Sequence, residues 1–81
     1  QNTAPMEFVY VKESAYPLVY KRTGKDETIY IVLNPSGQDV ECDAQIPQNV
    51  QVIYSNHGEA AYVDGKWKVP AASATFLKAE N

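Results

Sequence analysis

The chain is organised around one apolar run in which β-branched and aromatic residues predominate: Thr28-Ile29-Tyr30-Ile31-Val32-Leu33. A run this short that ends at a turn signal is typical of a strand buried on both faces, and Ile, Val and Tyr favour a pleated sheet. The turn is Asn34-Pro35-Ser36-Gly37, because Pro presets φ at the second turn position and Gly is favoured at the fourth. We therefore predict a central strand here, with the other strands arranged around it.

Alternation of apolar and polar residues with a period of two is clearest at residues 39–46. One set is predicted to face inward and the other to face water: Val40, Cys42, Ala44 and Ile46 inward, and Asp39, Glu41, Asp43 and Gln45 outward. Weaker patterns predict further strands at residues 6–12, 18–22, 50–54, 60–63, 66–69 and 73–78. Within 50–54, Val50, Val52 and Tyr54 are expected on one face and Ile53 on the other.

About eight short strands follow from these patterns, and no segment has a 3.6-residue period. Asp64-Gly65 predicts a two-residue type I′ hairpin, because that turn needs φ > 0 at both positions. Turn signals recur throughout the chain, which indicates an all-β, antiparallel β-sandwich. We expect a linker or frayed N-terminus at residues 1–5, a single β-sandwich domain at 6–79 and a tail at 80–81.

Length and charge narrow the function classes. A chain of 81 residues hides only about 60–65% of its unfolded surface, so its core is thin. It opens on Gln1 rather than Met, which suggests a processed protein or an excised piece of a larger one, and we expect the second. The net charge is −3 without a clustered basic face, which argues against nucleic-acid binding. No apolar run approaches the roughly 20 residues of a membrane span, and the single Cys42 excludes an internal disulfide.

The order of strands and turns resembles a known domain. A strand that ends in basic residues, Leu18-Val19-Tyr20-Lys21-Arg22, precedes an apolar strand that closes on Leu33-Asn34-Pro35-Ser36. A later strand reads Val52-Ile53-Tyr54-Ser55, and Pro70 introduces the last one, Ser73-Ala74-Thr75-Phe76-Leu77. Over residues 6–79 this pattern is similar to the C-terminal β-sandwich domain of the α-amylase family (family 13 glycoside hydrolases). Ala71-Ala72 depart from it, since many members have bulkier residues there and a second Pro after Pro70.

This resemblance implies a non-catalytic role. In that family the sandwich follows a catalytic (β/α)₈ barrel whose strands carry the catalytic carboxylates, and this chain has no barrel. The implied function is an accessory domain of an enzyme of starch or α-glucan metabolism. It would cover and stabilise the barrel of the same parent chain and contact α-glucan. The resemblance also suggests a secreted or periplasmic parent, although the compartment itself stays open.

Several side chains are candidates for chemistry. Glu41 and Asp43 lie at i and i+2, about the separation that the two carboxylates of a glycosidase need, but no apolar neighbours in sequence would raise a pKa. We therefore expect them on a solvated sheet face. His57 is expected in a surface turn, and Cys42 as an inert buried thiol.

The remaining acids do not form a recognisable metal site. Asp26-Glu27 and Glu59 offer oxygen ligands, but without the spacing of a calcium loop. We expect no metal and no cofactor, no nucleic-acid or membrane partner, and a monomeric isolated domain.

Aromatic residues are the best candidates for binding. Trp67 and Tyr62, across the Asp64-Gly65 hairpin, are predicted as a carbohydrate-binding platform, because flat rings pack against the C–H faces of sugars. The alternative is that Trp67 fills the core beside Val69. Exposed aromatics elsewhere would instead mark the face that docks on the barrel.

Three functions therefore stay open: a barrel-docking accessory domain, a glycan-binding module, and a free-standing sandwich for protein–protein contact. An apolar patch on a sheet face away from Trp67 favours the first, and an exposed Trp67 beside a groove favours the second. A long, unpaired apolar edge strand favours the third.

Overall fold

A computed structural model describes residues 6–10 and 15–81 of the chain. These residues form eight strands, all paired antiparallel, which confirms the all-β sandwich. The strands are β1 (Met6–Tyr10), β2 (Leu18–Thr23), β3 (Glu27–Asn34), β4 (Val40–Cys42), β5 (Gln51–Asn56), β6 (Ala61–Val63), β7 (Lys66–Val69) and β8 (Ser73–Glu80). The expected linker at 1–5 and the end of the strand expected at 6–12 lie outside the described residues. Among the described residues, no helix is long and apolar enough to cross a membrane.

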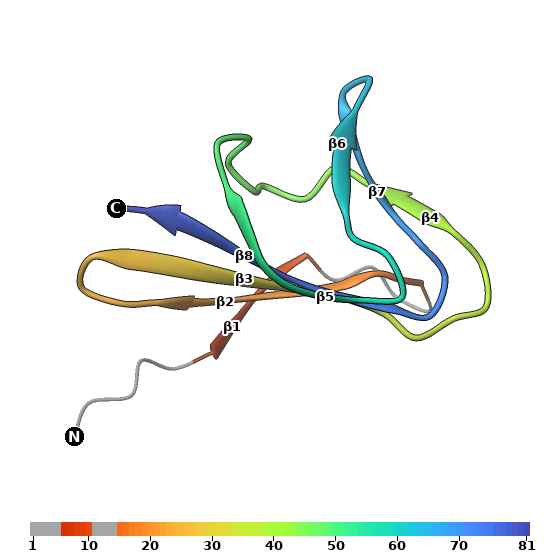
Figure 1. The fold of residues 1–81 in the computed structure, drawn as a ribbon, viewed down its shortest axis with the longest axis horizontal. Helices are drawn as coiled ribbons and strands as arrows, with labels where there is room; N and C mark the ends of the chain where they lie inside the picture. Colours follow the sequence, from red (N-terminus) through yellow and green to blue (C-terminus); the bar gives the residue numbers. More distant parts are fainter. Residues whose placement is uncertain (1–5, 11–14) are drawn as a thin grey trace.

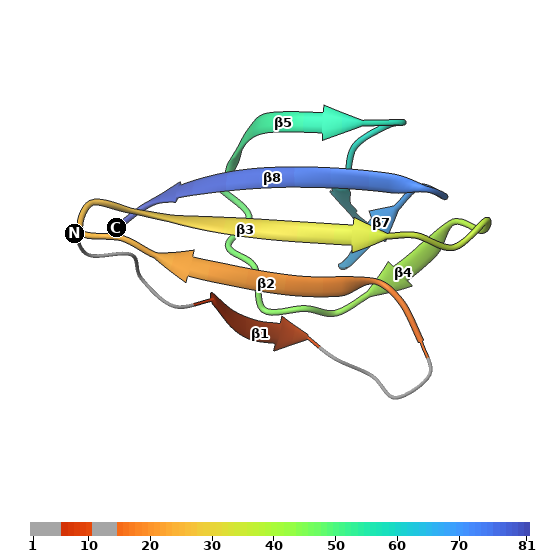
Figure 2. The same cartoon turned by 90° about the horizontal axis from the view of Figure 1, so that it is seen from below.

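The strands form two layers (Figure 1). One sheet has five strands in the order β1-β2-β3-β8-β5, and the other has three in the order β4-β7-β6. β3 is the middle strand of the larger sheet, as the apolar run predicted. Figure 2 looks onto the outer face of this sheet, where the five strands lie side by side.

Burial along β3 alternates with a period of two. Thr28, Tyr30, Val32 and Asn34 are buried, whereas Glu27, Ile29, Ile31 and Leu33 are half-buried. The buried set faces the smaller sheet and forms the core with residues of β2, β8, β4 and β7: Val19, Leu77, Cys42, Trp67 and Val69. Each large apolar side chain buried there contributes about 1.5–3 kcal/mol. β3 is therefore fully buried on its inner face and half-buried on its outer face. The prediction that it is buried on both faces holds for the inner face only.

The pattern at residues 39–46 keeps its faces but not its length. Cys42, Ala44 and Ile46 are buried and Val40 is half-buried, as predicted, while the four polar residues are exposed. Pairing with β7 ends at Cys42, opposite Trp67. Beyond it the Ile46 amide donates to the Ala44 carbonyl over 2.9 Å, and this local bond replaces a ladder.

The β6–β7 hairpin matches its prediction. Asp64 has φ 53° and Gly65 has φ 82°, so both central residues are left-handed as a type I′ turn requires. Val63 pairs with Lys66 across this turn.

β5 differs from its prediction. Val52 pairs with Leu77 of β8, but Tyr54 pairs with the next residue, Phe76, because Ile53 is an extra residue in a β-bulge. Since Leu77 faces the core and Phe76 faces outward, Val52 and Tyr54 lie on opposite faces of the sheet. The expectation that they share a face is wrong, and the bulge is the reason.

Candidate functional site

The outer face of the five-stranded sheet carries a continuous row of large apolar side chains. Cross-strand pairing places Phe8 beside Tyr20, Tyr20 beside Ile31, Ile31 beside Phe76 and Phe76 beside Tyr54. The row therefore crosses all five strands. The Phe8 and Tyr20 rings stack with centroids 4.6 Å apart, and Tyr54 meets Phe76 edge to face at 5.2 Å.

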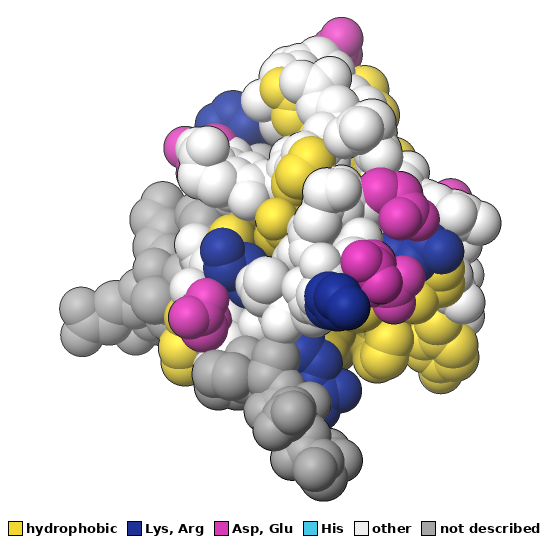
Figure 3. All heavy atoms as spheres, turned by 90° about the vertical axis from the view of Figure 1, so that its left-hand side faces the viewer, with side chains coloured by type: hydrophobic (Ala, Val, Ile, Leu, Met, Phe, Trp, Pro, Cys, Tyr) yellow, Lys and Arg dark blue, Asp and Glu magenta, His cyan; other side chains and the backbone are white. Residues whose placement is uncertain are grey.

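This row is open to solvent at both ends. Phe8 is 56% exposed and Tyr54 is 49% exposed, and the three residues between them are half-buried. The outer face of the five-stranded sheet points downward in Figure 1, and Figure 3 keeps the same vertical axis. Figure 3 shows hydrophobic side chains gathered at the lower right of the molecule. Patches of this kind on a small domain mark interaction surfaces.

Charged residues border the face at the β2–β3 hairpin. Arg22, Ile29 and Lys78 form the next cross-strand row, and Glu27 pairs with Glu80 beyond it. The Lys78 ammonium lies 3.9 Å from the Glu27 carboxylate and 3.6 Å from that of Glu80. The face is thus apolar in its middle and charged at this end, as in an interface with a polar rim.

The opposite end of the face has a hollow of about 350 Å³. Its floor is the cross-strand row Leu18, Leu33 and Ala74, and Asn56 follows Ala74 on β5. Three loops meet around this row, so the hollow lies where β3 leaves the sheet and β8 enters it. The other lining residues are the strand ends Asn34 and Ser73 and the loop residues Pro35, His57 and Ala72.

Asn34 fixes two of these loops. It is 0% exposed, and its Nδ2 donates to the carbonyl oxygens of Gln38 at 2.8 Å, Pro70 at 2.9 Å and Val69 at 3.3 Å. Its Oδ1 accepts from the Ser36 amide at 3.1 Å and from the Ser36 hydroxyl at 2.7 Å. One side chain thereby joins the β3–β4 loop to the end of β7.

The Pro70 carbonyl connects the two sequence motifs. It accepts from Asn34 Nδ2 and, at 2.8 Å, from the Ser73 hydroxyl. Leu-Asn-Pro-Ser at 33–36 and Pro-x-x-Ser at 70–73 therefore meet at one acceptor. This shared acceptor gives Asn34 and Ser73 a structural role in holding the two motifs together.

The two residues predicted to bind carbohydrate have different environments. Trp67 is 3% exposed and packs between Cys42 and Tyr62 of the neighbouring strands, whereas Tyr62 is 41% exposed. Their rings meet edge to face with centroids 5.4 Å apart. Trp67 is a core residue beside Val69, and glycan binding at this pair stays a prediction in which Tyr62 alone presents an open ring.

The sequence of residues 6–69 matches the family described as Maltogenic Amylase, C-terminal domain. The chain belongs to this family. The predicted resemblance to the C-terminal sandwich of amylases is thereby confirmed, and domains of this family belong to amylase chains with a catalytic barrel. No curated protein and no solved structure matched the chain.

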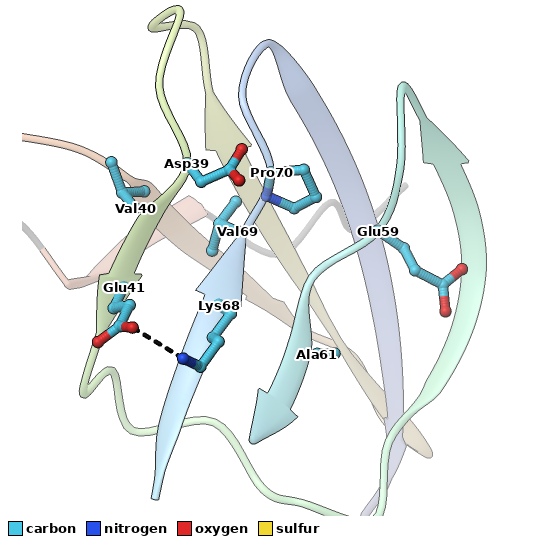
Figure 4. A pocket seen from close by; sticks show the side chains of 8 residues that line it. All are labelled: Asp39, Val40, Glu41, Glu59, Ala61, Lys68, Val69 and Pro70. Carbon is cyan, nitrogen blue, oxygen red and sulfur yellow. Dashed lines mark hydrogen bonds and ion pairs between the residues drawn. The ribbon is translucent and has the colours of Figure 1, made fainter. Parts of the chain in front are cut away.

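Membership of an amylase C-terminal family is consistent with a chain that is not itself catalytic. Three acids, Asp39, Glu41 and Glu59, line a second hollow of about 360 Å³ on the outer side of the three-stranded sheet (Figure 4), and Asp43 is not among its lining residues. Glu41 lies 2.8 Å from the Lys68 ammonium, and Figure 4 shows Glu59 pointing away from this pair. Asp39 accepts from the Ala71 amide over 2.9 Å. These acids do not converge on one point.

Glu41 also has the wrong protonation behaviour for an acid catalyst of glycoside hydrolysis. The hydrogen bond and the charge of Lys68 lower the pKa of the Glu41 carboxyl, whereas a general acid needs a raised pKa. Asp43, two residues further on, is exposed to solvent. Both residues of the amylase domain are therefore exposed to solvent, as expected from the sequence, but only Glu41 lies on a strand, because β4 ends at Cys42.

The other chemical candidates have structural positions. Cys42 is a buried free cysteine, and burial raises the pKa of its thiol. His57 is exposed in the β5–β6 turn. Within residues 6–10 and 15–81, no group of three or more His, Cys, Asp or Glu is placed to hold a metal ion.

Proposed function

We propose that this chain is an accessory domain that docks on the catalytic barrel of its parent amylase through the outer face of the five-stranded sheet. Docking would stabilise the barrel. The observation that carries the proposal is the half-buried apolar face of β3 and its neighbours, which no described element of this chain covers (Figure 2). Membership of the family, rather than any site in this chain, supports a parent enzyme that acts on starch or α-glucan.

The size of the face supports this use. Five strands at about 4.8 Å spacing span roughly 19 Å, and the eight residues of β3 span about 26 Å. Their product is about 500 Å² of flat area, or about 1,000 Å² summed over two partners. Contacts between domains of one chain bury roughly 600–1,500 Å².

Burial of the apolar row on another domain also explains why the run at residues 28–33 has no polar face. The run at residues 28–33 is apolar on both faces, whereas a sheet with one solvated face would show polar residues at Ile29, Ile31 and Leu33. The Trp67 side chain is already covered, so it does not compete as a large open surface.

The test uses the full-length parent enzyme and two matched charge insertions. Tyr54→Asp places a carboxylate in the docking face, and Val63→Asp places one at an exposed apolar position of β6, on the opposite sheet. We expect Tyr54→Asp to accelerate thermal inactivation of the enzyme and Val63→Asp to leave the rate near that of the parent. Equal rates for the two variants would contradict docking through this face.

A further inference from the structure

The two outermost strands of the five-stranded sheet are also the two that contain bulges. β1 and β5 lie at its two borders, and no further strand of the described residues pairs with either of them (Figure 2). Register shifts interrupt the β1–β2 ladder between Phe8 and Tyr10 and the β5–β8 ladder between Val52 and Tyr54. The β2–β3 and β3–β8 ladders inside the sheet run without a shift. The irregular pairing is therefore confined to the borders of the sheet.

A strand at the border of a sheet exposes a row of unpaired N–H and C=O groups to which another chain can add a strand. Charged side chains, Pro, short length and bulges are the features that block such additions. β4 and β6, at the borders of the smaller sheet, have only three residues each. β1 carries the charged Glu7 in addition to its bulge. Three of the four borders are therefore protected by their length or their charge.

β5 has none of these protective features except the bulge. Its six residues, Gln51–Asn56, include neither a charged residue nor a Pro, and all six are exposed. Val52, Ile53 and Tyr54 form an apolar centre whose side chains are 36–49% exposed. By composition, β5 is the border that is most open to strand addition.

The bulge disturbs the spacing that strand addition needs. On a regular strand the backbone groups that face outward repeat every second residue, about 6.8 Å apart. Ile53 is an extra residue between the Val52–Leu77 pair and the Tyr54–Phe76 pair, so this repeat is broken in the middle of β5. A bulge also bends its strand and increases the local twist, which turns the edge away from a straight partner.

We propose that the bulge at Ile53 is a protective device that keeps β5 from pairing with the β5 strand of a second copy of this chain. A second copy is the relevant partner because each chain has a net charge of −3, and β5 is a border at which two copies meet without adding like charges. This role belongs to the 81-residue chain itself and does not depend on docking of the outer face.

Deletion of Ile53 removes the bulge without changing the neighbouring pairs. Val52 and Tyr54 become consecutive, as their partners Leu77 and Phe76 already are, so each keeps its partner and its face. In analytical ultracentrifugation we expect the native chain at its monomer mass of 9.0 kDa and the deletion variant at about twice that mass. If hydrophobicity alone drove association, loss of the exposed Ile53 side chain would reduce it, so the expected increase identifies the edge.

Two controls separate the edge from other causes. Ser55→Lys in the deletion background places a lysine on the exposed border strand, and we expect it to restore the monomer. Ile53→Ala keeps the extra residue and is expected to stay monomeric. Deletion of Val52 is a second route to a regular strand, since Ile53 then takes the position opposite Leu77. Trp67 emission reports whether each variant is folded, because Trp67 is the single tryptophan and is buried.

Each other result would overturn the proposal. A folded deletion variant that stays monomeric shows that the bulge does not protect the edge. Association that Ser55→Lys leaves unchanged takes place at another surface. Association of the native chain that Ser55→Lys abolishes shows that the edge is open despite the bulge. If neither deletion variant folds, the bulge is required for the fold itself and the protective role is wrong.

Discussion

Replacing Asn34 by Ala removes the side chain that joins the two loops. The variant deletes three donated and two accepted hydrogen bonds at a residue without solvent exposure. In the variant, the Pro70 carbonyl keeps its hydrogen bond from the Ser73 hydroxyl. The Gln38 and Val69 carbonyls and the amide and hydroxyl of Ser36 lose their hydrogen bonds to the Asn34 side chain.

The expected loss follows from these contacts. Each net hydrogen bond contributes about 0.5–1.5 kcal/mol, and a buried group left unpaired costs about 1–3 kcal/mol. Three of the five bonds are 2.9 Å or shorter, and we assign each of them about 1 kcal/mol. The free energy of unfolding is therefore expected to fall by about 3 kcal/mol. Domains of 81 residues have roughly 4–12 kcal/mol in total, so this is a large fraction.

Urea unfolding of the isolated domain, followed by Trp67 fluorescence, measures this loss. Trp67 is the single tryptophan and is buried, so its emission reports the core. With a slope of about 1–1.5 kcal/mol per molar urea, the midpoint is expected to fall by about 2–3 M. Asn56→Ala on the exposed β5 is the control, with an expected change below about 0.5 kcal/mol. A loss below about 1 kcal/mol for Asn34→Ala would refute the reasoning.

Four further predictions concern single residues. Ala72→Gly is expected to raise the unfolding free energy by about 0.5–1 kcal/mol in the same urea assay, since Gly adopts the left-handed conformation without strain. The Cys42 thiol is expected to react with a disulfide reagent only on unfolding, because it is buried and its pKa is raised; rapid reaction of the folded chain would contradict this. Because Lys68 lowers the pKa of the Glu41 carboxyl, its stabilisation is present above the unfolded pKa of glutamate and is lost as pH falls through the folded value. The difference in stability between the native chain and Glu41→Gln is therefore expected to shrink in acid. A difference that grows in acid would contradict a lowered pKa of Glu41 in the folded chain. Titration with linear maltooligosaccharides is expected to leave the Trp67 indole chemical shift unchanged because the ring is buried, and a localised shift there would instead support glycan binding at the Trp67–Tyr62 pair.

The sequence predicts the strands well because their signals are local. Alternation with a period of two identifies the faces of residues 39–46, and Asp64-Gly65 identifies its hairpin from two residues. The central position of β3 follows from an apolar run that leaves no polar face. Each of these inferences depends on neighbours in the chain and needs no knowledge of the partner strand.

The sequence does not predict the features that depend on partners distant in the chain. The bulge at Ile53 arises from pairing with β8, and the sequence of β5 contains no signal that predicts it. Trp67 is equally suited to a core or a surface platform until the strands beside it are placed. The hollow exists because Ala74 lies between Leu33 and Asn56, three residues from three strands.

The apolar row on the outer face is only partly predictable from the sequence. The apolar run at residues 28–33 identifies its residue on β3, Ile31. The rest of the row depends on the strand register, which places Phe8, Tyr20 and Phe76 in line with Ile31. Asn34 was part of a turn signal, and its burial and its bonds to β7 emerge only from the meeting of the two sheets.

Hydroxyl-radical footprinting of the full-length parent enzyme and of the isolated domain tests the docking face most directly. Phe8 and Tyr54 are exposed at the two ends of the apolar row, and Tyr62 on β6 is an internal control of similar exposure. We expect oxidation of Phe8 and Tyr54 to fall in the full-length enzyme while that of Tyr62 stays the same. Equal oxidation of Phe8 and Tyr54 in both forms would contradict docking of the catalytic barrel on the five-stranded sheet.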